Sequence, residues 1–403
     1  MVIGIDASQA NKKERTGTEW YAFYILREWI LTNAFSEHEV WLYIQMPLCD
    51  DLPALPKNWH VHILKWPPKI FWSQVRLSWE FLFSRIDLLF VPAHTIPLIH
   101  PRKTVTIVHD IGFETNPELY SKKSVVQINS WIIQILISFF VRIFTLGKYG
   151  ANELDYQRFG LRFAIAHTTL IFTVSQFTKN EIRKKFDKHP SLVVAYNGIL
   201  HKEFYHPFSK KLTALVKEKY SLQKPYILSV GRIEKKKNSL ELAKIFKQLT
   251  EQEVDSNLEL VYVGGEGFES DQVHNYVSAH KLEHRVRFLG WVPQKDLAPL
   301  LSGASLFAFF SAYEGFGVPL LQALAVGAPV VASNLEVFRE IADNCATYCD
   351  PHETKETSVI CQKILENAQR ETVSKCAELT HRFTWEITAN IIKKNLESIL
   401  AKN

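Results

Sequence analysis

The amino-acid sequence predicts an α/β protein built from two doubly wound, Rossmann-like domains. Short apolar runs alternate along the 403 residues with longer amphipathic stretches, a pattern typical of parallel strands connected by helices. The runs are rich in Val, Ile, Leu and Phe at successive positions, which indicates strands that are covered on both faces. Apolar residues make up 47% and charged residues 22% of the chain, a composition that excludes wholesale disorder, collagen and coiled-coil arrays.

The predicted strands fall into two series, separated by a polar and basic segment at residues 197–224. The first series comprises Val2–Asp6, Glu39–Ile44, Asp87–Val91, Val105–Asp110, Ile171–Ser175 and Val193–Asn197. The second comprises Tyr226–Val230, Leu258–Gly264, Val286–Gly290, Leu306–Phe310 and Pro329–Ser333, and a helical stretch at Trp385–Ala401 follows it. We therefore expect a first domain at residues 1–205, a second at residues 206–385, and a C-terminal helix at residues 386–403.

The basic excess of the chain lies in its first half. Lys and Arg number 47 against 42 Asp and Glu, a net charge of +5, and residues 1–200 hold this whole excess together with eight of the ten tryptophans. The segment 131–147 is apolar almost all round a helix, so it is predicted either to be buried or to face lipid or a partner. Five cysteines without a regular pattern argue against a disulfide framework and favour a reducing compartment. Since Met1–Asp6 is predicted to be a strand rather than a signal peptide, we expect a cytoplasmic protein.

The strongest motif is a turn between a strand and a helix in the second series. After Leu306–Phe310 the chain passes through Gly315-Phe316-Gly317, and Val318 with the following proline opens a helix. The amides of Phe316, Gly317 and Val318 are expected to be donors at the positive end of that helix, where anionic or polyhydroxylic ligands bind. Glu314 before the turn and Gln322 beyond it are candidate acceptors for hydroxyl groups. A plain turn of this kind without a ligand is the alternative.

A second motif follows the first strand of the second series. Gly231 allows a close backbone approach, and Arg232 and Lys237 are expected at the carboxyl end of the sheet, where doubly wound folds bind their ligands. A guanidinium and an ammonium together suit a pyrophosphate. The alternative is a solvated basic loop.

Two weaker candidates lie in the first half, and no metal site is predicted. Gly17 lies in a turn that opens a helix, and His109 ends an apolar strand, where it either points into a crevice or is a core histidine. His60 and His62 lie on a strand-like pattern, and Cys345 and Cys349 lack partner ligands at a known metal-binding spacing.

These motifs resemble those of the family-4 glycosyltransferases, which have the GT-B fold. Glu314-Gly-Phe-Gly-Val-Pro-Leu-Leu-Gln322 resembles the family's E-x₇-E motif, and Gly231-Arg232 with Lys237-Asn238 resembles its donor-phosphate motif. Supporting matches span most of the chain: Thr173–Ser175, Tyr196–Gly198, Val263–Gly264, Phe288–Val292 and Pro329–Ser333. Within the family, Phe90–His94 and Thr106–Asp110 resemble the mannosyltransferase branch that builds bacterial surface polysaccharides.

The resemblance implies a fold, a reaction and a set of roles. The fold would have a cleft between the two domains, with residues 386–403 crossing back to the first. The reaction would move a sugar, mannose being the best guess, with retention from a GDP- or UDP-linked donor to a glycan or lipid-linked acceptor, without a metal or cofactor. Arg232 and Lys237 would neutralise the diphosphate, Glu314 would hold the donor sugar, and His109 would sit beside the reacting centre; these four are the expected catalytic residues. The other expected donor contacts are Gly17, Gly231, Gly290, Val292, Gly315, Phe316, Gly317, Val318 and Gln322.

One departure from the family pattern leaves a second interpretation open. Gln322 stands where the family has a glutamate that holds the ribose hydroxyls, so the charge is lost while an acceptor oxygen remains. A non-catalytic, nucleotide-sugar-binding subunit of a glycan assembly complex is therefore the alternative to an enzyme. The basic excess and the tryptophans of the first half suggest contact with an anionic membrane at the inner face of the cytoplasmic membrane. No nucleic-acid-binding motif is present in the sequence, so no such partner is expected.

Overall fold

The computed structural model describes residues 1–66, 72–121, 148–150, 152–251, 257–367 and 376–402. The described chain forms two compact units, one of Met1–Gly198 with Trp385–Asn403 and the other of Ile199–Thr384. The first unit ends at Gly198, inside the polar segment 197–224, whereas the sequence had suggested a boundary at residue 205. The segment 131–147, predicted to be an apolar helix, lies outside the described residues.

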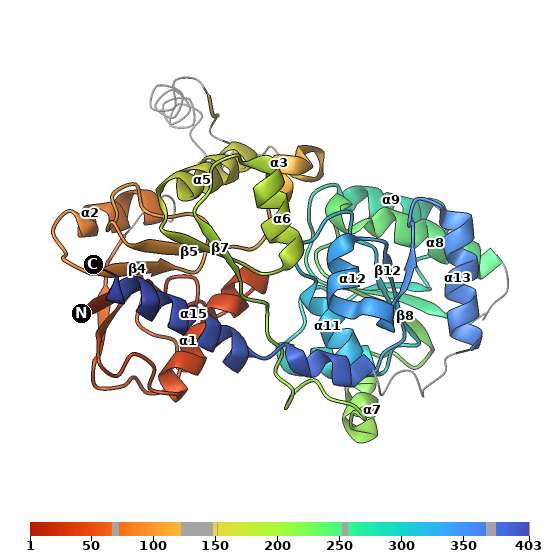
Figure 1. Cartoon of the computed structure of the whole chain (residues 1–403). Helices are drawn as coiled ribbons and strands as arrows, with labels where there is room; N and C mark the ends of the chain where they lie inside the picture. Colours follow the sequence, from red (N-terminus) through yellow and green to blue (C-terminus); the bar gives the residue numbers. More distant parts are fainter. Residues whose placement is uncertain (67–71, 122–147, 151, 252–256, 368–375, 403) are drawn as a thin grey trace. The chain divides into compact units, whose positions relative to one another are not determined.

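The first unit is a parallel sheet with helices on both faces (Figure 1). Its strand order is β3-β2-β1-β4-β5-β6-β7, so the order reverses between β1 and β4. The strands are β1 (Val2–Asp6), β2 (Glu39–Ile44), β3 (Trp59–Ile63), β4 (Leu88–Val91), β5 (Thr104–Val108), β6 (Leu170–Thr173) and β7 (Ser191–Val194). β4, β5 and β6 are buried at every residue, as the continuous apolar runs predicted.

Local signals in the sequence explain where the helices of the first unit begin. Thr16 and Glu19 form a capping box at the start of α1 (Gly17–Leu31), and the Ser175 hydroxyl accepts the Thr178 amide at the start of α6. A π-helix at Trp72–Leu77 continues directly into α2 (Ser78–Phe81). The other helices are α2 (Ser78–Phe81), α3 (Gly112–Thr115), a 3₁₀ turn at Pro117–Leu119, α5 (Glu153–His167) and α6 (Gln176–Lys185).

The C-terminal helix α15 (Trp385–Ala401) belongs to the first unit, as expected. It packs against α1, where the indole N–H of Trp29 donates to the carbonyl of Ala389 at 3.0 Å. The Trp385 ring also stacks on Tyr24, with the ring centres 5.0 Å apart. The chain therefore returns to its first unit after completing the second. The cleft expected between the units stays a prediction.

The second unit is also a parallel sheet, with the strand order β10-β9-β8-β11-β12-β13. The strands are β8 (Tyr226–Val230), β9 (Glu259–Val263), β10 (Val286–Phe288), β11 (Leu306–Phe309), β12 (Val330–Ser333) and β13 (Thr347–Cys349). The helices are α7 (Lys210–Lys219), α8 (Ser239–Glu251), α9 (Ser270–Ala279), α10 (Gln294–Ser302), α11 (Val318–Ala325), α12 (Glu336–Ala342) and α13 (Thr354–Glu366). The α8 helix packs beside α9 and α13, and α11 packs beside α10 and α12 (Figure 1). The strand order reverses between β8 and β11, which places the ligand-binding edge of such a sheet at these two strands.

The structure corrects two of the predictions about secondary structure. The segment 197–224, interpreted as a linker, contains α7, whose last residue Lys219 forms an ion pair with the buried Asp296 of α10. The strand list omitted β3 and β13, because neither is a continuous buried run. Among the residues that the structure describes, no helix is long and apolar enough to cross a membrane.

Candidate functional site

The two strongest sequence motifs meet at the point where the strand order of the second unit reverses. Residues 231–238 follow β8 and residues 311–317 follow β11, and these strands are neighbours. Two hydrogen bonds join the loops: the amide of Ala312 donates to the carbonyl of Lys236, and the Asn238 side chain donates to the carbonyl of Phe310, both at 2.8 Å. Asn238 is buried in a left-handed conformation, so its amide is held in place. Segments some eighty residues apart in the chain thus form one surface.

Lys237 and Glu314, one from each loop, form an ion pair at the centre of this surface. The Ser311 hydroxyl donates to the same Oε1 of Glu314 at 2.8 Å, and the Lys237 ammonium also lies 5.3 Å from the centre of the Phe309 ring. Both side chains are largely shielded from solvent, with exposed fractions of 20% and 13%. The geometry therefore brings together Lys237, which the sequence analysis assigned to the diphosphate, and Glu314, which it assigned to the donor sugar.

Arg232 lies at the same edge and is much more exposed. Its side chain is 63% accessible; Nη2 donates to the carbonyl of Glu266 at 3.1 Å, and Nε lies 3.8 Å from a carboxylate oxygen of Glu234. A guanidinium has five N–H donors, so these contacts leave several for a ligand.

Three glycines at the ends of adjacent strands keep this edge free of side chains. Gly231, Gly264 and Gly290 follow β8, β9 and β10, and their φ angles are +142°, +141° and +65°. The amide of Gly264 donates to the carbonyl of Gly290 at 2.8 Å, and a Cβ on Gly264 would lie 2.0 Å from the carbonyl oxygen of Gly231. The three loops therefore run backbone against backbone. Beyond Gly290, Val292 is nearly buried, whereas Trp291, to which the sequence assigned no role, is 63% exposed.

The remaining donor candidates form the start of α11. Gly317 is its N-cap at φ +103°, and its carbonyl accepts the amides of Leu320 and Leu321 at 3.0 and 3.2 Å. Gly315 and Phe316 are buried and Val318 is partly buried, so the turn forms a packed wall beside Glu314. Gln322 lies one turn further on and is 8% exposed. The positive end of this helix dipole thus lies beside the Lys237–Glu314 pair.

His109 follows β5 in the first unit, and its burial favours the neutral ring. Its Nε2 lies 3.3 Å from the carbonyl oxygen of Pro92, and its ring meets Tyr21 edge to face at 5.1 Å. Burial lowers the pKa of His109 to about 4, and the neighbouring His94 imidazole also opposes its protonation. A carbonyl can only accept a hydrogen bond, so Nε2 carries the proton and Nδ1 is an acceptor at neutral pH.

The predicted residues therefore fall into two groups. Residues from Gly231 to Gln322 line the carboxyl edge of the second sheet. Gly17 begins α1 with open space around its Cα, and it belongs with His109 to the first unit. The approach of these two residues to the donor residues stays a prediction. Among the described side chains there is no group of three or more His, Cys, Asp or Glu that could hold a metal ion.

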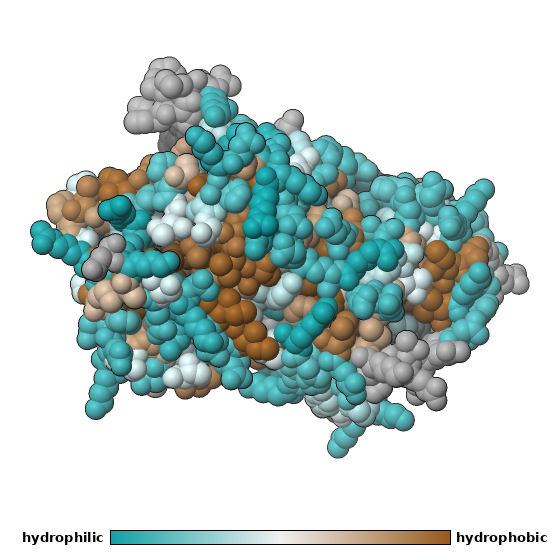
Figure 2. All heavy atoms as spheres, viewed as in Figure 1, coloured by the Kyte–Doolittle hydropathy of each residue, from teal (hydrophilic) through white to brown (hydrophobic). Residues whose placement is uncertain are grey.

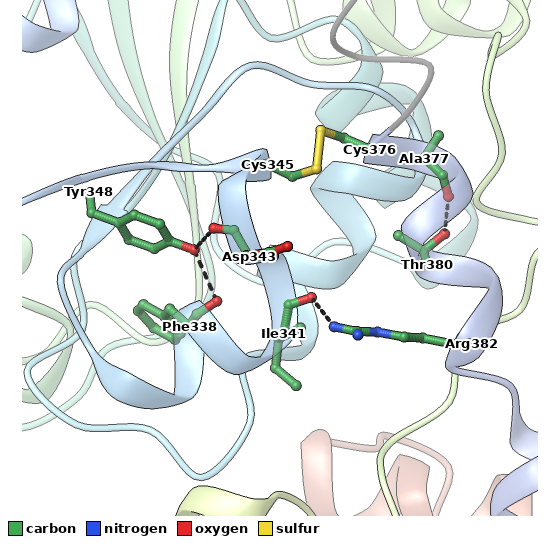
Figure 3. The surroundings of a disulfide bond; sticks show 9 residues. All are labelled: Phe338, Ile341, Asp343, Cys345, Tyr348, Cys376, Ala377, Thr380 and Arg382. Carbon is green, nitrogen blue, oxygen red and sulfur yellow. Dashed lines mark hydrogen bonds between the residues drawn. A yellow bond between two sulfur atoms is a disulfide. The ribbon is translucent and has the colours of Figure 1, made fainter.

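The sequence missed a disulfide bond between Cys345 and Cys376 (Figure 3). The two residues are 31 positions apart, and their Cα atoms are 5.4 Å apart. No spacing rule singled out this pair among the five cysteines, because the fold alone brings the turn after α12 next to Cys376. The inference of a chain without disulfides is therefore wrong at this position.

Residues 213–380, which lie within the second unit, match the family of glycosyl transferases group 1. Over these residues the chain is similar to a glycosyl transferase group 1 domain. This match confirms the resemblance inferred from the two motifs, both of which lie inside the matched residues.

Curated relatives of the chain include enzymes of bacterial surface polysaccharides. The chain is 30% identical over 250 residues to the O-antigen chain mannosyltransferase B of Escherichia coli, an alignment that covers 61% of this chain and 65% of that protein. It is 26% identical over 293 residues to the O-antigen chain mannosyltransferase RfbU of Salmonella typhimurium, covering 72% of this chain and 68% of that one. The chain thus spans a little under two thirds of the first of these relatives.

Solved structures share the fold over the whole chain. A sucrose-phosphate synthase from Thermosynechococcus elongatus is 17% identical with a TM-score of 0.72, and the match covers 100% of both chains. HepE from Anabaena, solved in complex with UDP-glucose, is 18% identical with a TM-score of 0.71 and covers 98% of this chain and 99% of that one. The group 1 domain therefore lies in a chain with the two-domain GT-B fold that the sequence predicted.

Proposed function

We propose that the protein is a retaining glycosyltransferase that moves a sugar from a nucleotide diphosphate donor to a glycan or lipid-linked acceptor of a surface polysaccharide. This proposal rests on the position of Arg232, Lys237 and Glu314 where the strand order of the second sheet reverses. There Lys237 and Glu314 form an ion pair. Mannose is the sugar favoured by the names of the relatives, two of which are O-antigen chain mannosyltransferases.

The Lys237–Glu314 ion pair offers a mechanism that links binding of the diphosphate to binding of the donor sugar. A diphosphate placed beside Lys237 competes with the carboxylate for the ammonium, and its two charges and several oxygens favour the exchange. Glu314, once released, can accept hydrogen bonds from sugar hydroxyls. Arg232 adds a bidentate contact, and the α11 dipole stabilises the charge that develops as the sugar leaves. We propose that these groups neutralise the diphosphate themselves, without a metal or cofactor.

His109 would act through its neutral form. Because its proton is on Nε2, the Nδ1 lone pair can accept a hydrogen bond from a hydroxyl of the acceptor or the donor sugar. With Gly17 near the phosphates, it would complete the site from the first unit. Positioning and charge stabilisation then supply most of the rate, since no covalent nucleophile is assigned.

Donor binding and turnover test this proposal. Arg232→Ala and Lys237→Ala should abolish transfer from GDP-mannose or UDP-sugars and weaken binding of the free nucleotide in calorimetry. Lys235→Ala is the matched control, because Lys235 lies in the same loop but forms an ion pair with Glu269 at 3.2 Å. Unchanged turnover in Arg232→Ala, with the fold intact by circular dichroism, would overturn the assignment.

Gln322 is the observation that favours a second function, a non-catalytic nucleotide-sugar-binding subunit. Its amide replaces the carboxylate expected for ribose, so donor binding without chemistry is a coherent alternative. Hydrolysis of the donor distinguishes the two functions. Slow release of free sugar, lost in Lys237→Ala, identifies an enzyme, whereas nucleotide-sugar binding without hydrolysis or transfer identifies the subunit.

We propose further that the first unit contacts an anionic membrane at the inner face of the cytoplasmic membrane through α2. Trp79 and Phe83 are 63% and 74% exposed there. The Ser78 hydroxyl accepts hydrogen bonds from the amides of Leu98 and Ile99. These two exposed apolar residues therefore lie beside the start of α2. Figure 2 shows this apolar surface over α2. Arg85 and Arg102 are exposed cations close in sequence to these apolar residues, and they would complement an anionic headgroup layer.

Cosedimentation with vesicles tests the membrane contact. The protein should pellet with phosphatidylglycerol vesicles at low salt and lose this association as the salt concentration rises. A Trp79→Ser and Phe83→Ser double variant should stay in the supernatant. Val359→Ser, at a 42% exposed position of α13, is the control. Equal pelleting of the double variant, or no pelleting of the wild type, would refute this contact.

A further inference from the structure

The loop at Gly315–Val318 is held by two phenylalanines that come from different segments. The ring of Phe338, on α12, lies so close to Gly317 that a Cβ there would be 3.0 Å from its Cε1 atom. The ring of Phe383 meets Phe316 edge to face, with the ring centres 5.6 Å apart. Both rings are buried, at 0% and 2% exposure. The backbone of the loop therefore rests on these two rings.

The segments that carry the two rings are joined to each other. Arg382, next to Phe383, donates from Nη2 to the carbonyls of Glu340 and Ile341 in the last turn of α12, at 2.8 and 3.3 Å. Figure 3 shows the bond to Ile341. A cation at the carboxyl end of a helix also interacts favourably with the helix dipole. A few residues away, the Cys345–Cys376 disulfide joins the turn after α12 to the start of the segment 376–384.

Hydrogen bonds hold both segments between the disulfide and the rings. On the α12 side, the Tyr348 hydroxyl lies 2.6 Å from the carbonyl of Asp343 and 3.2 Å from that of Phe338. On the other side, the Thr380 hydroxyl donates to the carbonyl of Ala377 at 2.6 Å, and Phe383 donates its amide to Thr380 at 2.9 Å. Figure 3 shows the two bonds of the Tyr348 hydroxyl and the bond from Thr380 to Ala377 around the disulfide. These hydrogen bonds and the chain itself thus connect the cross-link to both rings.

We propose that Phe338 and Phe383 are positioning residues for the donor loop, and that the Cys345–Cys376 disulfide sets the spacing between them. The physical reason is that backbone donors and the start of a helix stabilise charge only when they are held in place before the ligand arrives. Gly317 adopts a φ of +103°, and glycine restrains its own backbone least of all residues. The ring of Phe338 against Gly317 and the ring of Phe383 against Phe316 supply restraint that the glycine lacks. The role in donor binding rests on the proposed function, whereas the restraint of the loop does not.

Hydrogen exchange at the amides of residues 315–318 tests the restraint directly. Phe383→Leu keeps an apolar side chain but removes the ring edge that meets Phe316, so exchange at these amides should rise by about tenfold or more. The donor KM should rise with it, while kcat changes much less, because the loop can still close on a bound donor at an entropic cost. Phe246→Leu is the matched control: Phe246 is also fully buried in the second unit, but it lies on α8, in a core cluster that includes none of residues 315–318. This control should lower the melting temperature without raising exchange at residues 315–318.

A variant without the disulfide tests the role of the cross-link. Cys345→Ser with Cys376→Ser should raise exchange in the loop in the same direction as Phe383→Leu, whereas Cys361→Ser, at a buried free cysteine, should not. Unchanged loop exchange in Phe383→Leu overturns the positioning role, and unchanged exchange in the double serine variant overturns the role of the disulfide. If the wild type neither binds nor turns over a nucleotide sugar, the proposed function fails, and the exchange measurements still decide the restraint.

Discussion

Replacing Gly264 or Gly290 by alanine is a sharp test of the backbone arrangement at the donor edge. Both glycines end a strand of the second sheet and both have positive φ angles, +141° and +65°. A Cβ on Gly264 would lie 2.0 Å from the carbonyl oxygen of Gly231, whereas a Cβ on Gly290 would meet nothing within 4 Å. An alanine at Gly264 therefore clashes with the backbone of Gly231, whereas an alanine at Gly290 has room for its Cβ and only strains the backbone.

The expected costs follow from these geometries. At Gly290 an alanine takes the left-handed region at about 1–2 kcal/mol, and the reduced entropy of the unfolded chain offsets part of this. At Gly264 the conformation is almost restricted to glycine and costs about 1–3 kcal/mol. The carbonyl of Gly231 must also move by more than about 1 Å to relieve the overlap, which adds about 1–3 kcal/mol of packing strain. We expect Gly264→Ala to lower the free energy of unfolding by about 4 kcal/mol and Gly290→Ala by about 1 kcal/mol.

Urea unfolding of both variants, followed by circular dichroism, measures these costs. Displacement of Gly231 also moves Arg232, so Gly264→Ala should weaken nucleotide binding by calorimetry more than Gly290→Ala does. A Gly264→Ala variant as stable as Gly290→Ala would refute the backbone contact between the β8 and β9 loops.

Three further predictions concern other parts of the molecule. The Cys345–Cys376 disulfide spans 31 residues, so its loss in the double serine variant should cost about 3–4 kcal/mol by loop-closure entropy; urea unfolding no different from that of Cys361→Ser would contradict this. Because the pKa of His109 is lowered to about 4, the unfolded chain gains a proton between pH 6.5 and 4 that the folded chain does not, so stability falls as pH falls through this window. His109→Gln should lose less stability than the wild type between pH 7 and 4.5 in thermal unfolding, and an identical loss would exclude this role. Gln322→Glu should keep or lower the donor KM, since a carboxylate accepts more strongly from ribose hydroxyls; a higher KM would show that Gln322 is adapted to a different contact.

Most of the architecture could be predicted from the sequence because parallel strands buried on both faces leave a local signature. The continuous runs at β4, β5, β6, β11 and β12 are such strands, and each was placed to within a residue or two at either end. The edge strands β3 and β13 carry a weaker signal, because one of their sides meets solvent. The helix α7 was missed since none of its residues is buried, so its apolar pattern is faint.

The residue types at the donor-binding edge of the second sheet could be identified from the sequence alone. They are a glycine, two basic residues and an acid, and each follows a strand at a short, fixed spacing. Only the tertiary structure decided which of these groups touch. The pairing of Lys237 with Glu314, and the stacking of three glycine loops, depend on the strand order β10-β9-β8-β11. The disulfide and the two rings beneath the donor loop likewise depend on segments that are distant in the chain and adjacent only in the fold. Local sequence patterns report the burial and the conformation of a residue, whereas the identity of its long-range partner is set by how the whole chain packs.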